Sequence, residues 1–364
     1  MSGGAALWRE LLGEATERLA AAGVESADVE ARRIVVAAAG CDDSAWHSEL
    51  DRPATRRGVA AFDRMLGRRA AGEPLQYVVG SWGFRTLDLF VDPRVLIPRP
   101  ETEIVAGCAL DELQRRADAL QSTGRGGPGG GGAEPLCSST QAKVVAARPP
   151  APDASSGAGG GSGVPLCSST RGEESSRPGP PPPPPRVSAP GEMLLAADLG
   201  CGSGAIGLSL AAERVDVEVF CTDVSADALA VASANLAGLG RPARRVRLAE
   251  GSWFEALPVE ARGRLDVIVS NPPYIAEGGS LPAEITDHEP PVALYSGETG
   301  LEATSTILAG APEWLAPGGA VVLELADGTA GRVRELAGTA GLADVAVHPD
   351  LNGVDRVLVA RRPT

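Results

Sequence analysis

The stretch Asp198-Leu199-Gly200-Cys201-Gly202-Ser203-Gly204 decides the predicted fold, because it follows an apolar segment at 193–199 and precedes a helical pattern. Glycines here allow the backbone to turn sharply and to approach a ligand at the amino end of a helix. Helical stretches then alternate with further apolar segments at 217–222, 245–249, 265–270 and 319–325. This alternation predicts an α/β fold with a doubly wound, mostly parallel sheet.

The end of the chain has a different pattern. Val345 to Val347 and Val357 to Val359 lie on either side of Asn352-Gly353. Short β-branched segments around a turn predict an antiparallel pair that closes the sheet. The complete prediction is a seven-stranded, Rossmann-like sheet within a catalytic domain at 191–364.

Residues 1–72 are predicted to form a small, all-helical domain. Apolar residues recur there at helical spacing, and Gly23 is placed to end the first helix. We interpret the domain as a packing or substrate-docking module, since nothing in it resembles a catalytic motif. The apolar positions of the three expected helices are Leu7, Leu11, Ala15 and Leu19; Val29, Ile34, Val35 and Ala38 after Ser26; and Val59, Phe62 and Leu66.

A β-hairpin and a connector are predicted at 73–103. From Gln76 to Val91 apolar residues alternate around Gly80 and Gly83, which is typical of a hairpin. Leu96 to Glu103 follows, and its two prolines fix the backbone before a helix that starts near Glu101 or Thr102. We expect the first helix of the catalytic domain at 104–118.

Residues 119–190 are predicted to be a disordered insertion. Gly, Pro, Ser and Ala dominate this stretch, and Pro135 to Thr140 recurs as Pro165 to Thr170. Such a composition buries too little apolar surface to offset the entropy of ordering. A proline-rich docking peptide is the alternative interpretation.

Charge and cysteine content narrow the functional classes. The chain has a net charge of −14, and 119–190 holds six basic and four acidic residues, so the rest carries −16. This disfavours a large nucleic-acid surface, which is normally basic. The six cysteines show no metal-ligand spacing, and His47, His288 and His348 show none either. Without a long apolar run we expect a cytoplasmic protein with no metal and no membrane contact.

The glycine stretch and a second acid predict a nucleoside site. Asp223 ends the second strand, nineteen residues after Gly204, where a carboxylate can bind both ribose hydroxyls. Gly202, Gly204 and Gly207 also fit the dinucleotide pattern, so an NAD-dependent enzyme is a rival hypothesis. Asp198 disfavours it, because a carboxylate before the glycines suits an amino-acid ammonium better than a pyrophosphate. S-adenosylmethionine, a nucleoside that carries an amino acid, suits both acids.

A second motif, Ser270-Asn271-Pro272-Pro273-Tyr274, ends the fourth strand. Pro272 drives Asn271 toward extended angles and has no N–H, so neither helix nor ladder continues. An amide side chain, free carbonyls and a ring at one strand end can bind a planar –NH2 group. A plain proline-rich turn is the structural alternative. If strands one and four are neighbours, both motifs face one crevice beyond the carboxyl ends of the strands.

The chain resembles the HemK/PrmC-type protein-(glutamine-N5) methyltransferases of the class-I S-adenosylmethionine family. The resemblance covers about 1–118 and 191–364. The motifs that carry it are Ile97 to Glu103, Asp198 to Gly204, Thr222 to Ser225, Val269 to Ile275 and Asp350 to Arg356. The chain departs from the family in the insertion and at His288, where an aromatic residue is more usual.

The resemblance implies a substrate and a division of roles. The substrate would be the glutamine of the Gly-Gly-Gln loop in bacterial class-I peptide chain release factors. Asn271, Pro272, Pro273 and Tyr274 would bind that glutamine. The donor would be held by Asp198, Gly200, Cys201, Gly202, Ser203, Gly204 and Asp223, with Trp253 lining its pocket beside Asn271.

Catalysis is predicted to rest on alignment and dipoles. We expect the Asn271 side-chain oxygen and the Pro272 carbonyl to accept the two hydrogens of the substrate amide. Tyr274 is expected to pack against the planar amide. Two alternatives remain: a nucleic-acid base N-methyltransferase, which can share the Asn271 to Tyr274 motif, and a non-catalytic protein that keeps the fold.

Overall fold

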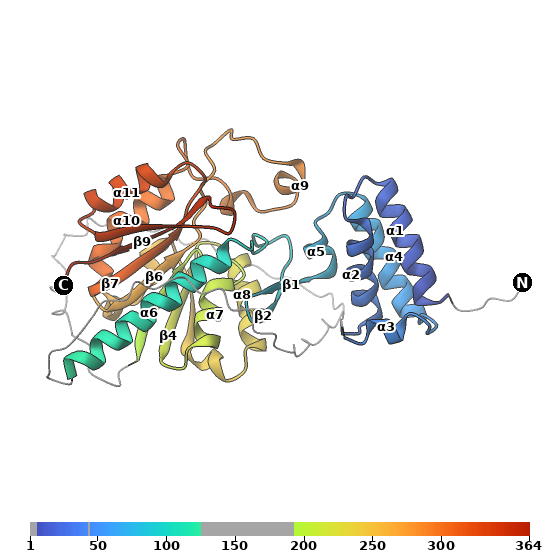
Figure 1. The fold of residues 1–364 in the computed structure, drawn as a ribbon, viewed down its shortest axis with the longest axis horizontal. Coiled ribbons are helices and arrows are strands. Elements are labelled where there is room, and N and C mark those ends of the chain that lie inside the picture. Colours follow the sequence, from blue (N-terminus) through green and yellow to red (C-terminus); the bar gives the residue numbers. More distant parts are fainter. Residues whose placement is uncertain (1–5, 43, 125–192) are drawn as a thin grey trace, which may run out of the picture.

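The computed structural model describes residues 6–42, 44–124 and 193–364. A helical region, a short hairpin and a seven-stranded sheet follow one another in it (Figure 1). Most of the predicted insertion, residues 125–190, lies outside the described residues, so the prediction of disorder stays a prediction.

The amino-terminal helices pack around their own apolar core. Leu19, Ile34, Phe62 and Leu66 are fully buried there, as their helical spacing predicts. Val29 was placed in this core by its apolar character, but it is 52% exposed and lies on the outer face. The helices are α1 (Trp8–Ala21), α2 (Ala27–Ala39), α3 (Trp46–Glu49) and α4 (Arg56–Ala70).

The predicted hairpin is shorter than expected. Its strands are β1 (Ser81–Phe84) and β2 (Leu87–Phe90), whereas Leu75–Val79 forms a helix, α5. The prediction of a strand at Tyr77 and Val79 is therefore wrong. Tyr77 and Val78 are both buried although they are consecutive, and the Tyr77 hydroxyl donates to the Val95 carbonyl at 2.5 Å. Because these two consecutive side chains are both buried, the segment does not follow the buried-exposed alternation expected of a strand, and it forms a helical turn instead.

The helix after the connector is longer than 104–118. It is α6 (Thr102–Gly124), which begins where a helix start was predicted, near Glu101 or Thr102, and continues beyond 118 into the predicted insertion. Val105, Ala109 and Leu113 bury one face of α6 at helical spacing.

The large sheet has seven strands and is mostly parallel, as predicted. Its strands run β5 (Val246–Glu250), β4 (Val217–Asp223), β3 (Leu194–Leu199), β6 (Leu265–Ser270), β7 (Leu315–Glu324), β9 (Asp355–Arg361) and β8 (Ala343–Pro349). The first five are parallel. β9 is antiparallel to both β7 and β8, which confirms the closing pair.

The central strand β6 buries side chains on both faces of the sheet. In β6, Val267 and Val269 belong to one apolar cluster and Ile268 to the other, as expected for alternating side chains. The first cluster includes α6, α7 (Ala205–Glu213) and α8 (Ala226–Gly238), and the second includes α10 (Glu302–Trp314) and α11 (Ala330–Thr339). Shorter helices are η1 (Arg241–Arg245), η2 (Trp253–Ala256), η3 (Val259–Ala261), α9 (Ala283–Thr286) and η4 (Pro291–Ala293).

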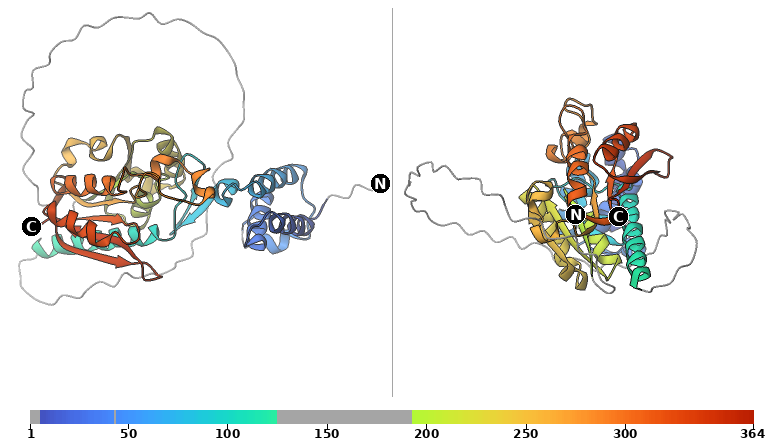
Figure 2. Two further views of the ribbon diagram at one scale, coloured as in Figure 1. Left: turned by 90° about the horizontal axis from the view of Figure 1, so that it is seen from above. Right: turned by 90° about the vertical axis from the view of Figure 1, so that its left-hand side faces the viewer.

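The helical region lies at one end of the molecule, with the hairpin between it and the sheet (Figure 2). Arg69 in α4 forms ion pairs with Glu30 in α2 at 2.5 Å and with Glu284 in α9 at 3.1 Å. The loop that carries α9 follows β6, so this side chain connects the helical region to a loop beside the carboxyl ends of the strands.

Candidate active site

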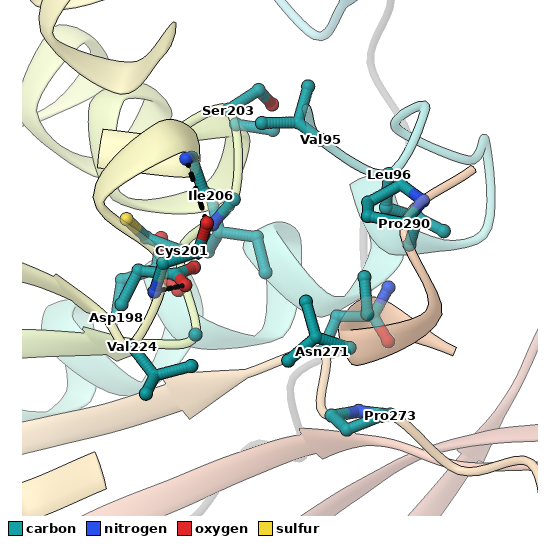
Figure 3. A pocket seen from close by; sticks show the side chains of 18 of the residues that line it. Val95, Leu96, Asp198, Cys201, Ser203, Ile206, Val224, Asn271, Pro273 and Pro290 are labelled. Atoms are coloured by element: carbon teal, nitrogen blue, oxygen red, sulfur yellow. Dashed lines mark hydrogen bonds between the residues drawn. The ribbon is translucent and has the colours of Figure 1, made fainter. Parts of the chain in front are cut away.

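A pocket opens beyond the carboxyl ends of β3, β4 and β6. The condition that the first and fourth predicted strands be neighbours is met, since Asp198 in β3 pairs in register with Val269 in β6. The glycine loop and Asn271 therefore lie on opposite sides of one pocket, with Val95, Leu96 and Pro290 along its rim (Figure 3).

The glycine loop needs its glycines for backbone geometry. Gly200, Gly202 and Gly204 have φ values of 70°, 55° and 83°, a region that side chains disfavour. Gly207, one turn into α7, is required for space. A β-carbon there would lie 2.3 Å from the Cys221 sulfur and 3.0 Å from Asp198 Oδ2. The loop can therefore approach a ligand closely, and α7 can pack closely against β4.

Asp198 has one satisfied oxygen and one free oxygen. Oδ2 accepts from the Gly207 N–H at 2.8 Å, whereas buried Oδ1 has no partner within the described residues. Burial raises the pKa of Asp198 to about 7, although the Gly207 N–H opposes the shift. An unpartnered buried carboxylate oxygen that lines a pocket is suited to a cationic ligand group.

Asp223 is oriented by the loop that it faces. Its Oδ2 accepts from the Gly202 N–H and its Oδ1 from the Ser225 N–H, both at 2.9 Å. Burial raises the pKa of Asp223, and these backbone donors oppose the shift. Each oxygen keeps further acceptor capacity toward the pocket, which suits hydroxyl donors.

Trp253 and Phe254 have different positions. Trp253 lines the pocket, in a left-handed conformation with φ of 46°, and lies over Gly200. Phe254 instead stacks on Trp314 with ring centroids 5.8 Å apart, so it belongs to the core.

The second motif contributes two residues to the pocket lining. Asn271 and Pro273 line the pocket, whereas Pro272 and Tyr274 do not, and neither does Gly204. The Tyr274 hydroxyl is directed at Glu324, 3.4 Å from Oε1. Burial and the charge of Glu324 raise the pKa of Tyr274 to about 12.

Sequence reasoning missed the side chains behind Asn271. Thr102, expected only as a helix start, lines the pocket, and Asn271 Nδ2 donates to its hydroxyl at 3.2 Å. That hydroxyl donates to Glu324 Oε2 at 2.6 Å. Glu324 ends the buried strand β7, and an acid after an apolar run was the signal available in the sequence.

The expected rigid connector also forms a wall of the pocket. Leu96 and Pro98 line it, and the buried carboxylate of Glu289 accepts from the Ile97 N–H at 3.2 Å and from the Arg99 guanidinium. These bonds attach the connector to the loop after β6. Arg99 within the prolines is therefore a structural partner of Glu289.

Two absences concern only the described part of the chain. Within residues 6–42, 44–124 and 193–364, no group of three or more His, Cys, Asp or Glu side chains could hold a metal ion. Among the same residues no helix has the length and apolarity needed to cross a bilayer.

Comparison of the sequence with known proteins identifies the family. Residues 10–80 match the PrmC N-terminal domain, and residues 191–288 match the methyltransferase small domain. A release factor glutamine methyltransferase of Xylella fastidiosa is 34% identical, covering 97% of both chains. Proteins of the same name from Cereibacter sphaeroides and Moorella thermoacetica are 33% and 32% identical, each covering 97% of this chain and 98% of the relative. The chain therefore belongs to the release factor glutamine methyltransferase family.

Proposed function

We propose that this chain transfers a methyl group from S-adenosylmethionine to the side-chain amide nitrogen of a glutamine in bacterial class-I peptide chain release factors. One observation carries the proposal: Asp198 and Asn271 lie at the ends of neighbouring strands and line one pocket, where buried Asp198 Oδ1 has no partner among the described residues. The relatives' names give the acceptor, a release factor glutamine.

The side of the pocket formed by Asp198, the glycine loop, Asp223 and Trp253, here called the donor half, suits S-adenosylmethionine. Asp198 Oδ1 would accept from the ammonium of the methionine part, and Asp223 would accept from the ribose hydroxyls. The glycine loop leaves room for close approach, and Trp253 offers a flat surface for the adenine. When bound, this donor supplies an electrophilic methyl group on its sulfonium.

The acceptor half would align the glutamine amide. An amide nitrogen is a weak nucleophile, because its lone pair is delocalised into the carbonyl. Asn271 Oδ1 and the Pro272 carbonyl would accept its two hydrogens, aim the nitrogen at the donor half and place negative dipoles beside the developing positive charge. Pro272 does not itself line the pocket, but it stands between Asn271 and Pro273, which do. Tyr274 would support this loop from behind through its ring.

The substrate is proposed to be a protein. The net charge of −14 disfavours a nucleic-acid substrate, which requires a basic surface. The helical region is proposed to dock the release factor, in the cytoplasm where translation ends. Its ion pair from Arg69 to Glu284 would keep that docking surface near the pocket.

The test is a transfer assay with radiolabelled S-adenosylmethionine. The purified chain is incubated with unmethylated release factor, with the same factor carrying Gln→Asn in its Gly-Gly-Gln loop, and with DNA and RNA. We expect label only in the unchanged release factor. Label in nucleic acid, or equal label in the Gln→Asn factor, would contradict the proposal.

A further inference from the structure

Asn271 is held by a chain of hydrogen bonds that crosses three elements. Its Nδ2 donates to the Thr102 hydroxyl at 3.2 Å, and that hydroxyl donates to Glu324 Oε2 at 2.6 Å. Thr102 is the first residue of α6, Asn271 follows β6, and Glu324 ends β7. Thr102 is 4% exposed and Glu324 2%, so the bond between these two side chains is shielded from solvent.

The direction of these two hydrogen bonds follows from the number of protons that each side chain can donate. An ionised carboxylate only accepts, so the one hydroxyl proton of Thr102 must point at Glu324. The Thr102 oxygen is then left as an acceptor toward Asn271 and requires the NH2 end of that amide. Asn271 Oδ1 must consequently face the other way. Within the described residues Oδ1 accepts no hydrogen bond, so it is available to a ligand.

We propose that Thr102 and Glu324 are positioning residues, which fix the Asn271 amide with its oxygen toward the acceptor glutamine. This inference rests on the proposed function and adds the reason why Asn271 presents an acceptor. Without the hydroxyl, the amide could rotate and present NH2 to the NH2 of the substrate. Two donors would then face each other and productive alignment would be lost.

Protonation of Glu324 would reverse the direction of both hydrogen bonds. A neutral carboxyl can donate to Thr102, whose own proton would then point at Asn271 and require Oδ1 there. Thr102 and Tyr274 bond to the carboxylate, Arg356 favours its ionised form, and Glu101 disfavours it. Burial outweighs the favourable partners and raises the pKa of Glu324 to about 7. Methyl transfer at saturating donor should therefore rise with pH up to this range and then level off.

The kinetic test uses Thr102→Val, Thr102→Ser and Glu324→Gln, with Thr304→Val as the matched control. Thr304 is a buried threonine in α10 that does not line the pocket. We expect Thr102→Val to lower kcat by about 10²-fold, with KM for the release factor changing less. Thr102→Ser keeps the hydroxyl and should stay within about threefold of the wild type, as should Thr304→Val.

Glu324→Gln should imitate the protonated acid. Its NH2 can donate to Thr102, so kcat should be lowered by about 10-fold or more and should no longer rise with pH. Donor affinity by calorimetry should stay within about twofold in every variant, because none of the substituted side chains is among those proposed to contact the donor. A Thr102→Val enzyme with unchanged kcat, or a Glu324→Gln enzyme with the wild-type pH profile, would overturn the inference.

A spectroscopic readout separates this inference from the proposed function. The side-chain NH2 signals of Asn271, assigned by their absence in Asn271→Ala, should shift with pH through the titration of Glu324. They should not shift in Thr102→Val. If the wild-type protein labels no release factor but its Asn271 signals shift with pH, the proposed function is overturned and the positioning role of Thr102 and Glu324 is supported. If the Asn271 signals of the wild type do not change with pH, the positioning role is overturned, whatever the methyltransferase activity.

Discussion

The proposed donor and acceptor halves of the pocket are built differently. In the donor half, Asp198 reaches a backbone N–H nine residues away and Asp223 one that is 21 residues away. In the acceptor half, Asn271 and Glu324 reach Thr102 across 169 and 222 residues. The donor half is thus a local motif that a linear sequence displays. The acceptor half exists only after the sheet has formed.

Each half also contains one buried carboxyl whose pKa burial raises to about 7. Asp198 keeps one oxygen that has no partner among the described residues, and this oxygen is the one proposed to bind the donor ammonium. Glu324 has both oxygens bonded within the protein. One acid is placed to bind, and the other is placed to hold a neighbouring side chain.

The largest effect is expected for Asn271→Ala. Loss of the acceptor oxygen should lower kcat by about 10²–10³-fold, the range seen when one preorganised polar group is removed. Donor affinity by calorimetry should change less than about twofold, because the two halves bind separate groups. Near-normal turnover would show that the acceptor half does not act through this amide.

Asp198→Asn should act on the other half. Loss of a charge-assisted hydrogen bond to the donor should weaken donor binding by roughly 10- to 100-fold. In the wild type, affinity should increase from pH 6 to 8 as Asp198 ionises, since its pKa is raised to about 7. The variant should lose that dependence in calorimetry. A wild-type affinity that does not vary with pH would contradict the assignment of Asp198.

The same substitution should stabilise the free protein. A carboxyl whose pKa is raised on folding destabilises the native state when it ionises, and this cost grows from about pH 4 to about pH 7 and is complete above. Asp198→Asn should therefore have a Tm above that of the wild type at pH 8, and the difference should vanish near pH 4. A lower Tm at pH 8 would show that Asp198 is stabilised by contacts beyond Gly207.

Gly207→Ala tests the packing beneath the glycine loop. Its new β-carbon would lie 2.3 Å from the Cys221 sulfur, so we expect a loss of about 1–3 kcal/mol in the free energy of unfolding. Gly331→Ala in α11 is the matched control, since nothing lies within 4 Å of its β-carbon, and it should gain roughly 0.5–1 kcal/mol. Denaturant titration measures both. Equal effects at the two sites would mean that the structure around Gly207 rearranges at little cost to accept the added β-carbon.

The smallest effect is expected for Tyr274→Phe. Its hydroxyl lies 3.4 Å from Glu324 Oε1, a distance at which a hydrogen bond is weak. The ring is kept, so kcat should stay within about threefold of the wild type. A loss comparable to that of Asn271→Ala would place the hydroxyl itself in the acceptor half.

Prediction from sequence succeeded where neighbours in sequence are neighbours in space. The strand ends, the glycine loop and the closing antiparallel pair follow from periodicity and turn residues. It failed at Leu75–Val79, where contacts on two sides override an alternating pattern, and at Val29, where apolar character does not reveal the outer face. The start of α6 at Thr102 agrees with the helix start predicted near Glu101 or Thr102, whereas its end was placed too early because Ala119 carries no strong boundary signal.

The sequence by itself determined the sheet, the position of Asn271 on the fourth strand and the donor loop between Asp198 and Gly204. Short-range sterics of glycine and proline and the alternation of apolar side chains are sufficient for these features. Only the tertiary structure decided that Thr102 and Glu324 stand behind Asn271, and that Pro272 and Tyr274 do not line the pocket. The orientation of one amide depends on hydrogen-bond partners that the order of residues along the chain does not bring together.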